Sequence, residues 1–294
     1  MKKVSLLILI INFIILVGCN EEYITKPEDS IQPVIKEELI EKKFLNAPIF
    51  IDLTSQTQIY LPPSINGYEI KWTYDNEIFK FDNHLLSILK DGKTTLSATI
   101  KDQKYTYTET FSFTIKNQII IQSEQHGLVF YYDFLNSSNK KVGKKMIPQM
   151  IVFHNTANSA SAYNEIRYLH SMSNTSTTSY HYAVDDTGIY QAIPNTNYAY
   201  HAGNMSINQV SIGIEIAKST INNNDIKDKA TKNAIKLISL LMYNYALAVD
   251  KVITHQASSG KYCPHDILNR YGLNRFYEEL NQENVLYKDY VAFL

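Results

Sequence analysis

The spacing of apolar residues changes once along the chain, and this change constrains the fold more than any other feature. From about residue 47 to 117, apolar and polar residues alternate in short runs such as Tyr68–Trp72, separated by turn residues. A period of two is typical of strands with one buried face. From residue 144 onward, candidate strands alternate with helical patterns, the longest at 226–247. The sequence therefore predicts a small all-β unit followed by an α/β domain, in which helices flank a mixed sheet.

The predicted domain boundaries follow these patterns. The all-β unit spans 46–117, a connecting segment spans 118–143, and the α/β domain spans 144–285. In the spacing of its strands, the all-β unit resembles the immunoglobulin-like domains of bacterial surface proteins, which implies a two-sheet sandwich. Its tryptophan, Trp72, is expected in the core between two sheets. A sugar-binding role for this ring is the alternative.

The first nineteen residues have the features of a bacterial export signal. Lys2 and Lys3 precede an apolar run that ends at Leu16-Val17-Gly18-Cys19. The small residue before the cysteine resembles the lipobox of bacterial lipoproteins, which implies cleavage before Cys19 and attachment of a lipid to its thiol. An uncleaved transmembrane helix is the alternative, although the run is shorter than the roughly 20 residues that span a bilayer. Residues 20–45, with mixed charges and two prolines, are expected to form a tether.

These features predict an extracytoplasmic protein that the lipid on Cys19 anchors to the cell membrane. The formal net charge of −1 offers no basic field for a nucleic-acid backbone, so nucleic acid is excluded as a partner. If Cys19 carries lipid, the only other cysteine, Cys263, has no disulfide partner. Metal ligation is a leading reason to keep such a thiol outside the cytoplasm. A monomer is the simplest expectation for a tethered protein.

A histidine and a cysteine lie near each other toward the C-terminus. His255 follows the last predicted strand, and Ser258-Ser259-Gly260 makes a turn back toward Cys263 plausible. Imidazole and thiolate together favour zinc. A catalytic zinc site needs a third protein ligand, and the best candidate is His154, at the end of the predicted strand 150–154.

Several motifs in one order resemble the N-acetylmuramoyl-L-alanine amidases of phages and bacteria, the family that includes the peptidoglycan recognition proteins. They lie within 144–280 and read IVFHNTAN at 151–158, SYHYAVDD at 179–186, YHAG at 200–203, SIGIEI at 211–216 and GKYCPH at 260–265. The resemblance implies that His154, His255 and Cys263 bind Zn²⁺. It also implies that Glu215 and Lys261 lie beside the attacking water, and that Tyr180 lies near the scissile bond.

Elementary chemistry supports these roles. Strand alternation places Glu215 on the face opposite Ile214 and Ile216, where its carboxylate can take a proton from the attacking water. A solvated strand carboxylate is the alternative. Lys261 lies two residues before Cys263, where its ammonium group can stabilise an oxyanion.

The remaining expected site residues are those that contact substrate. Tyr180 and His181 are neighbours on a predicted strand, so only one of them faces the cleft, and the family pattern favours Tyr180. The other motif residues expected to bind substrate are Thr156, Asn158, His201 and Gly203. For Thr156 and Asn158 the alternative is a role in capping the helix that begins near residue 159.

The predicted function is zinc-dependent hydrolysis of the amide bond between N-acetylmuramic acid and L-alanine in peptidoglycan. Glu215 is the expected general base, and Lys261 is expected to stabilise the oxyanion. The alternative is a surface receptor that binds muropeptides without cutting them. Three metal ligands together with Glu215 favour the enzyme, because a receptor has no need of an activated water.

Overall fold

A computed structural model of the chain describes residues 48–65, 67–101, 106–218 and 223–288. The predicted export signal, Cys19 and the tether lie outside these residues and stay predictions. Within the described part of the chain, no helix combines the length and the apolar character needed to cross a membrane.

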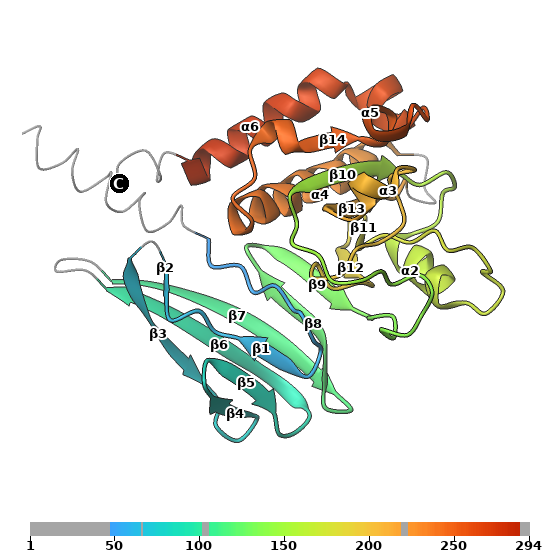
Figure 1. Cartoon of the computed structure of the whole chain (residues 1–294). Coiled ribbons are helices and arrows are strands. Elements are labelled where there is room, and N and C mark those ends of the chain that lie inside the picture. Colours follow the sequence, from blue (N-terminus) through green and yellow to red (C-terminus); the bar gives the residue numbers. More distant parts are fainter. Residues whose placement is uncertain (1–47, 66, 102–105, 219–222, 289–294) are drawn as a thin grey trace, which may run out of the picture. The chain divides into compact units, whose positions relative to one another are not determined.

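The N-terminal part is all-β, as its alternating pattern predicts (Figure 1). Its strands pair antiparallel in two sheets, one of order β1-β5-β4 and one that continues beyond this part. Leu96, Ala98 and Ile100 of β6 are buried, and the residues between them are not. These strands are β1 (Gln58–Tyr60), β2 (Ser64–Ile65), β3 (Tyr68–Tyr74), β4 (Phe79–Asp82), β5 (Leu85–Ile88), β6 (Gly92–Lys101) and β7 (Thr106–Lys116).

Trp72 lies on β3, on the same side of the strand as the buried Ile70, and is half-buried. Its indole N–H donates to the carbonyl oxygen of Pro62 over 2.8 Å, and its ring centroid is 6.3 Å from that of Phe111. The ring has packing contacts, but Trp72 is not fully buried and Phe111 belongs to β7 of the same sheet, so these contacts do not place it between two sheets as expected. The likeness of this part to immunoglobulin domains stays a prediction.

The segment 118–143, expected only to connect two domains, contains two further strands, β8 (Ile119–Gln125) and β9 (Leu128–Tyr132). β8 pairs antiparallel with β7 and β9, and β9 pairs parallel with β12 (Ile189–Gln191). One sheet therefore runs through eleven strands in the order β14-β10-β13-β11-β12-β9-β8-β7-β6-β3-β2. Pairing between strands so far apart in the chain leaves no local signal in the sequence. For this reason the spacing of apolar residues indicated only a boundary between the all-β part and the α/β part.

The C-terminal part has the mixed sheet and flanking helices that the sequence predicts. β10 (Met150–Asn155) pairs parallel with β13 (Ser211–Ile216) and with β14 (Val252–Thr254). β11 (Tyr182–Val184) pairs parallel with β13 and antiparallel with β12. The helices are α2 (Ala162–His170), α3 (Met205–Asn208), α4 (Asn224–Asn244), α5 (His255–Ser259) and α6 (Leu273–Lys288), with the 3-10 turn η2 (Val249–Lys251) and the π-helical turn η3 (Ile267–Tyr271).

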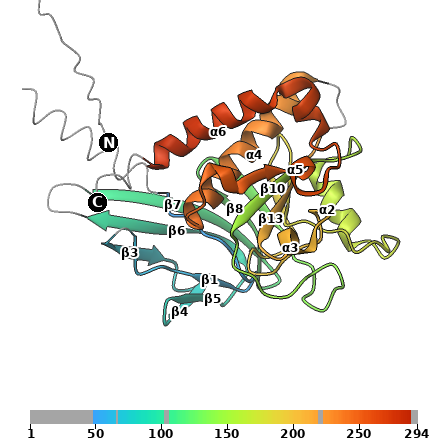
Figure 2. The ribbon, with the colours of Figure 1, turned by 45° about the horizontal axis from the view of Figure 1, so that its top comes forward.

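The longest helix, α4, covers the sheet with one apolar side. Asn223 caps it by accepting a hydrogen bond from the backbone N–H of Asp225. Ala230, Ala234 and Leu241 recur at helical spacing and are buried. α4 packs on β11 and β13, and α6 lies beside α4 (Figure 2).

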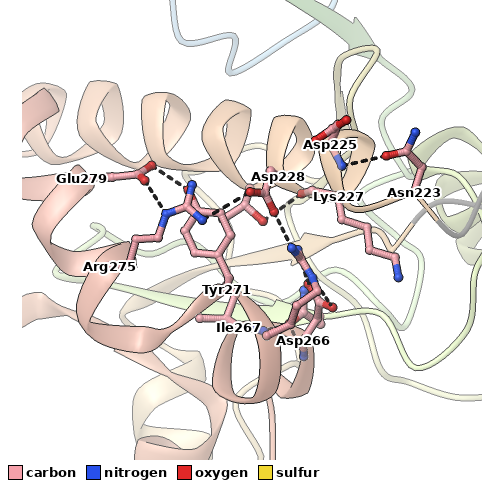
Figure 3. Close-up of polar contacts among 12 residues, drawn as sticks. Asn223, Asp225, Lys227, Asp228, Asp266, Ile267, Tyr271, Arg275 and Glu279 are labelled. Carbon is pink, nitrogen blue, oxygen red and sulfur yellow. Dashed lines mark hydrogen bonds and ion pairs between the residues drawn. The ribbon is translucent and has the colours of Figure 1, made fainter.

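An ion-pair network fixes the residues that follow Cys263. The guanidinium of Arg270, on η3, donates to Asp266 with Nη2 2.8 Å from Oδ2, and it also contacts Asp228 of α4. Figure 3 shows Asp228 and Asp266 at this junction. Since Asp266 is close to Cys263 in the chain, the network ties the cysteine-bearing loop to α4.

A second arginine extends this network to α6. Arg275 donates from Nε to Glu279 over 2.8 Å and also contacts Asp228. Its guanidinium carbon lies 4.0 Å from the ring centroid of Tyr271, a cation–π contact (Figure 3). Asp228 therefore has two cationic partners.

Replacing Arg270 with methionine should lower the free energy of unfolding by about 1–2 kcal/mol at pH 7, because the partly buried Asp266 loses its cationic partner and Asp228 loses one of two. Burial alone raises the pKa of Asp228, but hydrogen bonds and charge from Arg270 and Arg275 hold it below its usual value. A lowered pKa stabilises the fold above the unfolded value of about 4, and this contribution is lost as the pH falls through the folded value. The difference between wild type and variant should therefore shrink at pH 3.

Urea unfolding at pH 7 and pH 3 measures this difference. Arg167→Met, at an exposed position of α2, is the matched control and should change stability little at either pH. An Arg270→Met difference that stays constant down to pH 3 would contradict the electrostatic account.

Candidate functional site

Three side chains that are distant in the sequence meet at one edge of the sheet. His154, His255 and Cys263 are buried, and their ligand atoms all lie within 4.8 Å of one another. His154 is near the end of β10, and His255 begins α5 directly after β14, the parallel neighbour of β10. Cys263 follows α5, with its Sγ 4.0 Å from His154 Nδ1. The structure brings the predicted ligands together, in a group able to hold a metal ion.

The electrostatics of these three groups fit a cation. Burial lowers the pKa of His154 well below its usual value, and it also lowers the pKa of His255. Both imidazoles are therefore neutral at pH 7 and have a lone pair for a metal. Burial raises the pKa of the Cys263 thiol to about 11, so its thiolate needs a cation beside it. Two imidazoles and one thiolate are a donor set that suits zinc.

The rings of His201 and His154 are joined by a hydrogen bond. Nε2 of His154 lies 3.2 Å from Nδ1 of His201, and Nε2 of His201 lies 3.4 Å from the carbonyl oxygen of Ser211. Burial lowers the pKa of His201 to about 3, so this ring is neutral. The network assigns the proton of His154 to Nε2, donating to His201, and the proton of His201 to its own Nε2. Nδ1 of His154 is then left for a metal.

His201, which was expected to contact substrate, is 5% exposed, and its ring centroid lies 5.3 Å from that of His154. Its contact with substrate stays a prediction. A Cβ at Gly213 of β13 would lie 2.5 Å from the His201 ring, so the glycine makes the space that this ring fills. The other predicted residue of this motif, Gly203, is exposed with φ +65° and lies against Ser259 of α5. Its contact with substrate stays a prediction.

Glu215 lies beside the ligand cluster, on the face that strand alternation predicts. In the parallel register it pairs with His154 of β10 and with Ala183 of β11. Its Oε1 is 4.0 Å from His154 Nδ1, and its buried Oε2 has no hydrogen-bond partner among the residues that the structure describes. Burial raises the pKa of Glu215 to about 8, the charge of Glu165 adds to this, and the charge of Lys261 opposes it. Such a raised pKa is suited to a group that takes up a proton near neutral pH.

Lys261 is exposed on the loop between α5 and Cys263. Its backbone N–H donates to Ser259 Oγ over 3.3 Å. Its charge lowers the pKa of His154 and His255, which places the ammonium group within electrostatic reach of the cluster. Its expected place beside the attacking water stays a prediction.

Tyr180 and His181 precede β11, which begins only at Tyr182. The alternation expected for a strand over 180–184 therefore does not apply to them. His181 is buried, accepts a hydrogen bond at Nδ1 from Gly213 N and donates from Nε2 to the carbonyl oxygen of Asn197, in agreement with the structural role expected for it. Tyr180 is also buried and donates its hydroxyl proton to Oε2 of Glu165 over 3.1 Å.

In the loop after β10, the side chains of Thr156 and Asn158 form hydrogen bonds with the backbone of the same loop. The hydroxyl of Thr156 donates to the carbonyl oxygen of Asn158 over 3.1 Å, and Asn158 Oδ1 accepts from Ala160 N over 2.7 Å. The cap of α2 is Ser161, so neither Thr156 nor Asn158 caps this helix. Thr156 is buried and Asn158 is exposed, and the contact of both residues with substrate stays a prediction.

Asn155 is a site residue that sequence reasoning missed. Its Oδ1 accepts hydrogen bonds from the backbone N–H groups of Asp266 and Ile267 at 3.0 and 3.2 Å. Its Nδ2 donates to the carbonyl oxygen of Ile216 over 3.3 Å. This one side chain links β10, β13 and the turn after Cys263. The sequence feature that could have pointed to this role is an asparagine at the end of an apolar strand, directly after the candidate ligand His154.

Replacing Asn155 with alanine should weaken metal binding by about 10- to 100-fold, the usual cost of losing an outer-shell partner. Without Asn155, the turn after Cys263 has two fewer backbone hydrogen bonds to hold it. Competition with a chromophoric zinc chelator measures the affinity. Asn164→Ala, at an exposed position of α2, should bind metal as the wild type does. Unchanged affinity in Asn155→Ala would show that the loop holds its place without this side chain.

Residues 144–266 match the family model described as N-acetylmuramoyl-L-alanine amidase. The N-acetylmuramoyl-L-alanine amidase CwlA of Bacillus subtilis is 43% identical over 140 residues, which are 45% of this chain and 50% of that protein. The amidase XlyB of the same organism is 42% identical over 132 residues, 44% of this chain and 41% of that protein. The chain thus spans about half the length of the curated relatives that it matches. The solved catalytic domain of XlyA is 37% identical, with a TM-score of 0.47, and the match covers 51% of this chain and 98% of that chain.

Proposed function

Since residues 144–266 belong to the N-acetylmuramoyl-L-alanine amidase family, we propose that this chain hydrolyses the amide bond between N-acetylmuramic acid and L-alanine in peptidoglycan. The observation that carries the proposal is the buried group of His154, His255 and Cys263 with the carboxyl group of Glu215 beside it. A receptor that only binds muropeptides is the second candidate, and no feature of the site favours it.

Zinc is the metal that we propose for this group. His154, presenting Nδ1, would hold the ion together with His255 and Cys263, three protein ligands as in other catalytic zinc sites. When bound, zinc acts as a Lewis acid that polarises the scissile carbonyl group and makes water a better nucleophile.

The chain's own residues supply the proton transfer and the charge stabilisation. The carboxylate of Glu215, with an unpartnered Oε2, accepts a proton from the attacking water and later delivers it to the leaving amine nitrogen. The ammonium group of Lys261 stabilises the negative charge that develops on the carbonyl oxygen. His201 and Asn155 keep the ligands in place.

The deciding experiment incubates the full-length chain, in detergent, with purified peptidoglycan. We expect new free amino groups of L-alanine to appear, a chelator to stop their release, and added zinc to restore it. Binding of the metal-loaded protein to several wall types without release of amino groups would overturn the hydrolase and support the receptor.

We further propose that the protein acts outside the cytoplasm as a monomer anchored by lipid on Cys19, on the basis of its N-terminal sequence. Cys19→Ala should fail to incorporate labelled fatty acid in a bacterial host and should leave the membrane fraction. Unchanged membrane association of this variant would favour the alternative, an uncleaved transmembrane helix.

A further inference from the structure

Glu165 of α2 is a buried carboxyl group that the proposed reaction does not use. It is 8% exposed, and its Oε2 accepts the hydroxyl proton of Tyr180 over 3.1 Å. Its second oxygen, Oε1, is buried, and no group in the described part of the chain forms a hydrogen bond with it. Leaving a buried polar atom unpaired costs free energy of folding. Packing alone therefore does not account for a glutamate at this position.

Tyr180 lies near the proposed active site, because β11, which begins two residues after it, pairs with β13 at Glu215, and Glu165 is its hydrogen-bond partner. The charge of Glu165 acts on the carboxyl group of Glu215, and both carboxyl groups act on the Tyr180 hydroxyl. Burial and these two charges raise the pKa of Tyr180 well above its usual value. Tyr180 is therefore a protonated phenol at neutral pH. A phenol has one proton to donate, and here that proton points to Glu165.

We propose that Glu165 is a positioning residue that makes Tyr180 a hydrogen-bond acceptor for the N–H of the scissile amide. Because Glu165 holds the only proton of the phenol, the lone pairs of the phenolic oxygen are what it can offer to substrate. An acceptor for the amide N–H orients the nitrogen, so that its developing lone pair faces the proton donor as the C–N bond breaks. The inference rests on the proposed amide hydrolysis. Stabilising the negative charge on the carbonyl oxygen remains the role of Lys261.

The test compares a muropeptide amide with an ester analogue in which oxygen replaces the scissile N–H. Tyr180→Phe removes the acceptor, and Glu165→Leu removes the group that holds the phenol proton. On the amide, kcat should fall about 5- to 10-fold in either variant, the equivalent of one hydrogen bond. On the ester, which has no N–H to bind, kcat should stay within about twofold of wild type in both variants.

Two further readouts separate this role from a structural one. Glu165→Leu replaces a buried carboxyl group, one oxygen of which has no hydrogen-bond partner among the described residues, by an apolar group. The free energy of unfolding of this variant should therefore be unchanged or higher than that of the wild type, while its kcat on the amide falls. Glu165→Gln keeps a carbonyl oxygen that can accept the phenol proton, so it should restore most of the activity. The double variant Glu165→Leu with Tyr180→Phe should lose no more than the worse single variant, since both act through one contact.

Matched controls are Tyr168→Phe and Glu278→Gln, both at exposed helical positions, and zinc content is measured in every variant. Equal losses on amide and ester, or wild-type kcat in Glu165→Leu, would overturn the inference while leaving the amidase intact. A wild-type protein that releases nothing from peptidoglycan would overturn the proposed function as well. If Glu165→Leu does not fold, Tyr180→Phe reports on the same contact from the other side.

Discussion

The variant Cys263→Ser is expected to lose zinc and nearly all release of amino groups from peptidoglycan. Cys263 is the one thiol in a buried group whose ligand atoms lie within 4.8 Å of one another. A serine hydroxyl does not ionise at neutral pH, so the metal would lose the charge of a thiolate as well as a bond. We expect zinc affinity and activity to fall by more than about 100-fold, beyond the usual cost of losing an outer-shell partner.

Zinc content after dialysis and release of amino groups should be measured on the same protein sample. His255→Ala should behave like Cys263→Ser, because it removes another ligand. His84→Ala, at an exposed position of the all-β part, is the matched control and should retain both zinc and activity. Full zinc content in Cys263→Ser would show that the thiol is not a ligand.

The variant Glu215→Gln is expected to keep zinc but lose about 10²- to 10⁴-fold in kcat, the range typical of a general acid–base group. Glutamine has nearly the same shape as glutamate, so the register of β13 with β10 and β11 should persist. What it lacks is a group that can carry the proton from the attacking water to the leaving nitrogen. Retained zinc with lost turnover separates this residue from the ligands.

Single-turnover release from a muropeptide, with zinc content determined in parallel, tests this assignment. Glu278→Gln is the control, since that carboxylate lies on the exposed side of α6. Near-normal turnover in Glu215→Gln would mean that another group, such as the neighbouring Glu165, accepts the proton. Loss of zinc together with activity would instead make Glu215 a part of the metal site.

Local patterns were enough to predict most secondary structure in the C-terminal part. The buried isoleucines of β13 alternate with Glu215, and the apolar residues of α4 recur at helical spacing, so both elements could be placed within a few residues. Tyr180 and His181 were predicted on a strand, yet the backbone bends there and β11 begins at Tyr182. Whether a short segment pairs depends on its neighbours in space, which periodicity does not report.

The candidate site, like the fold, could be predicted only in part. The motifs around His154, Glu215, His255 and Cys263 pointed to side chains that the structure brings close together, because their chemical types and order are visible in one chain. The supporting side chains could not be assigned in this manner. His201 lies beneath His154 only because Gly213 leaves space for its ring, which is a fact of packing between two segments.

The succession of an all-β part and an α/β part could be predicted from the sequence, and so could the candidate metal ligands and the face of β13 that carries Glu215. Residue type and periodicity are local properties, so one chain is sufficient to read them. The shared sheet through β9 and β12, the hydrogen bonds of Asn155 to the turn after Cys263 and the contact between Glu165 and Tyr180 became visible in the folded structure alone. These features depend on contacts between residues far apart in the chain, and such contacts become visible only when the elements pack.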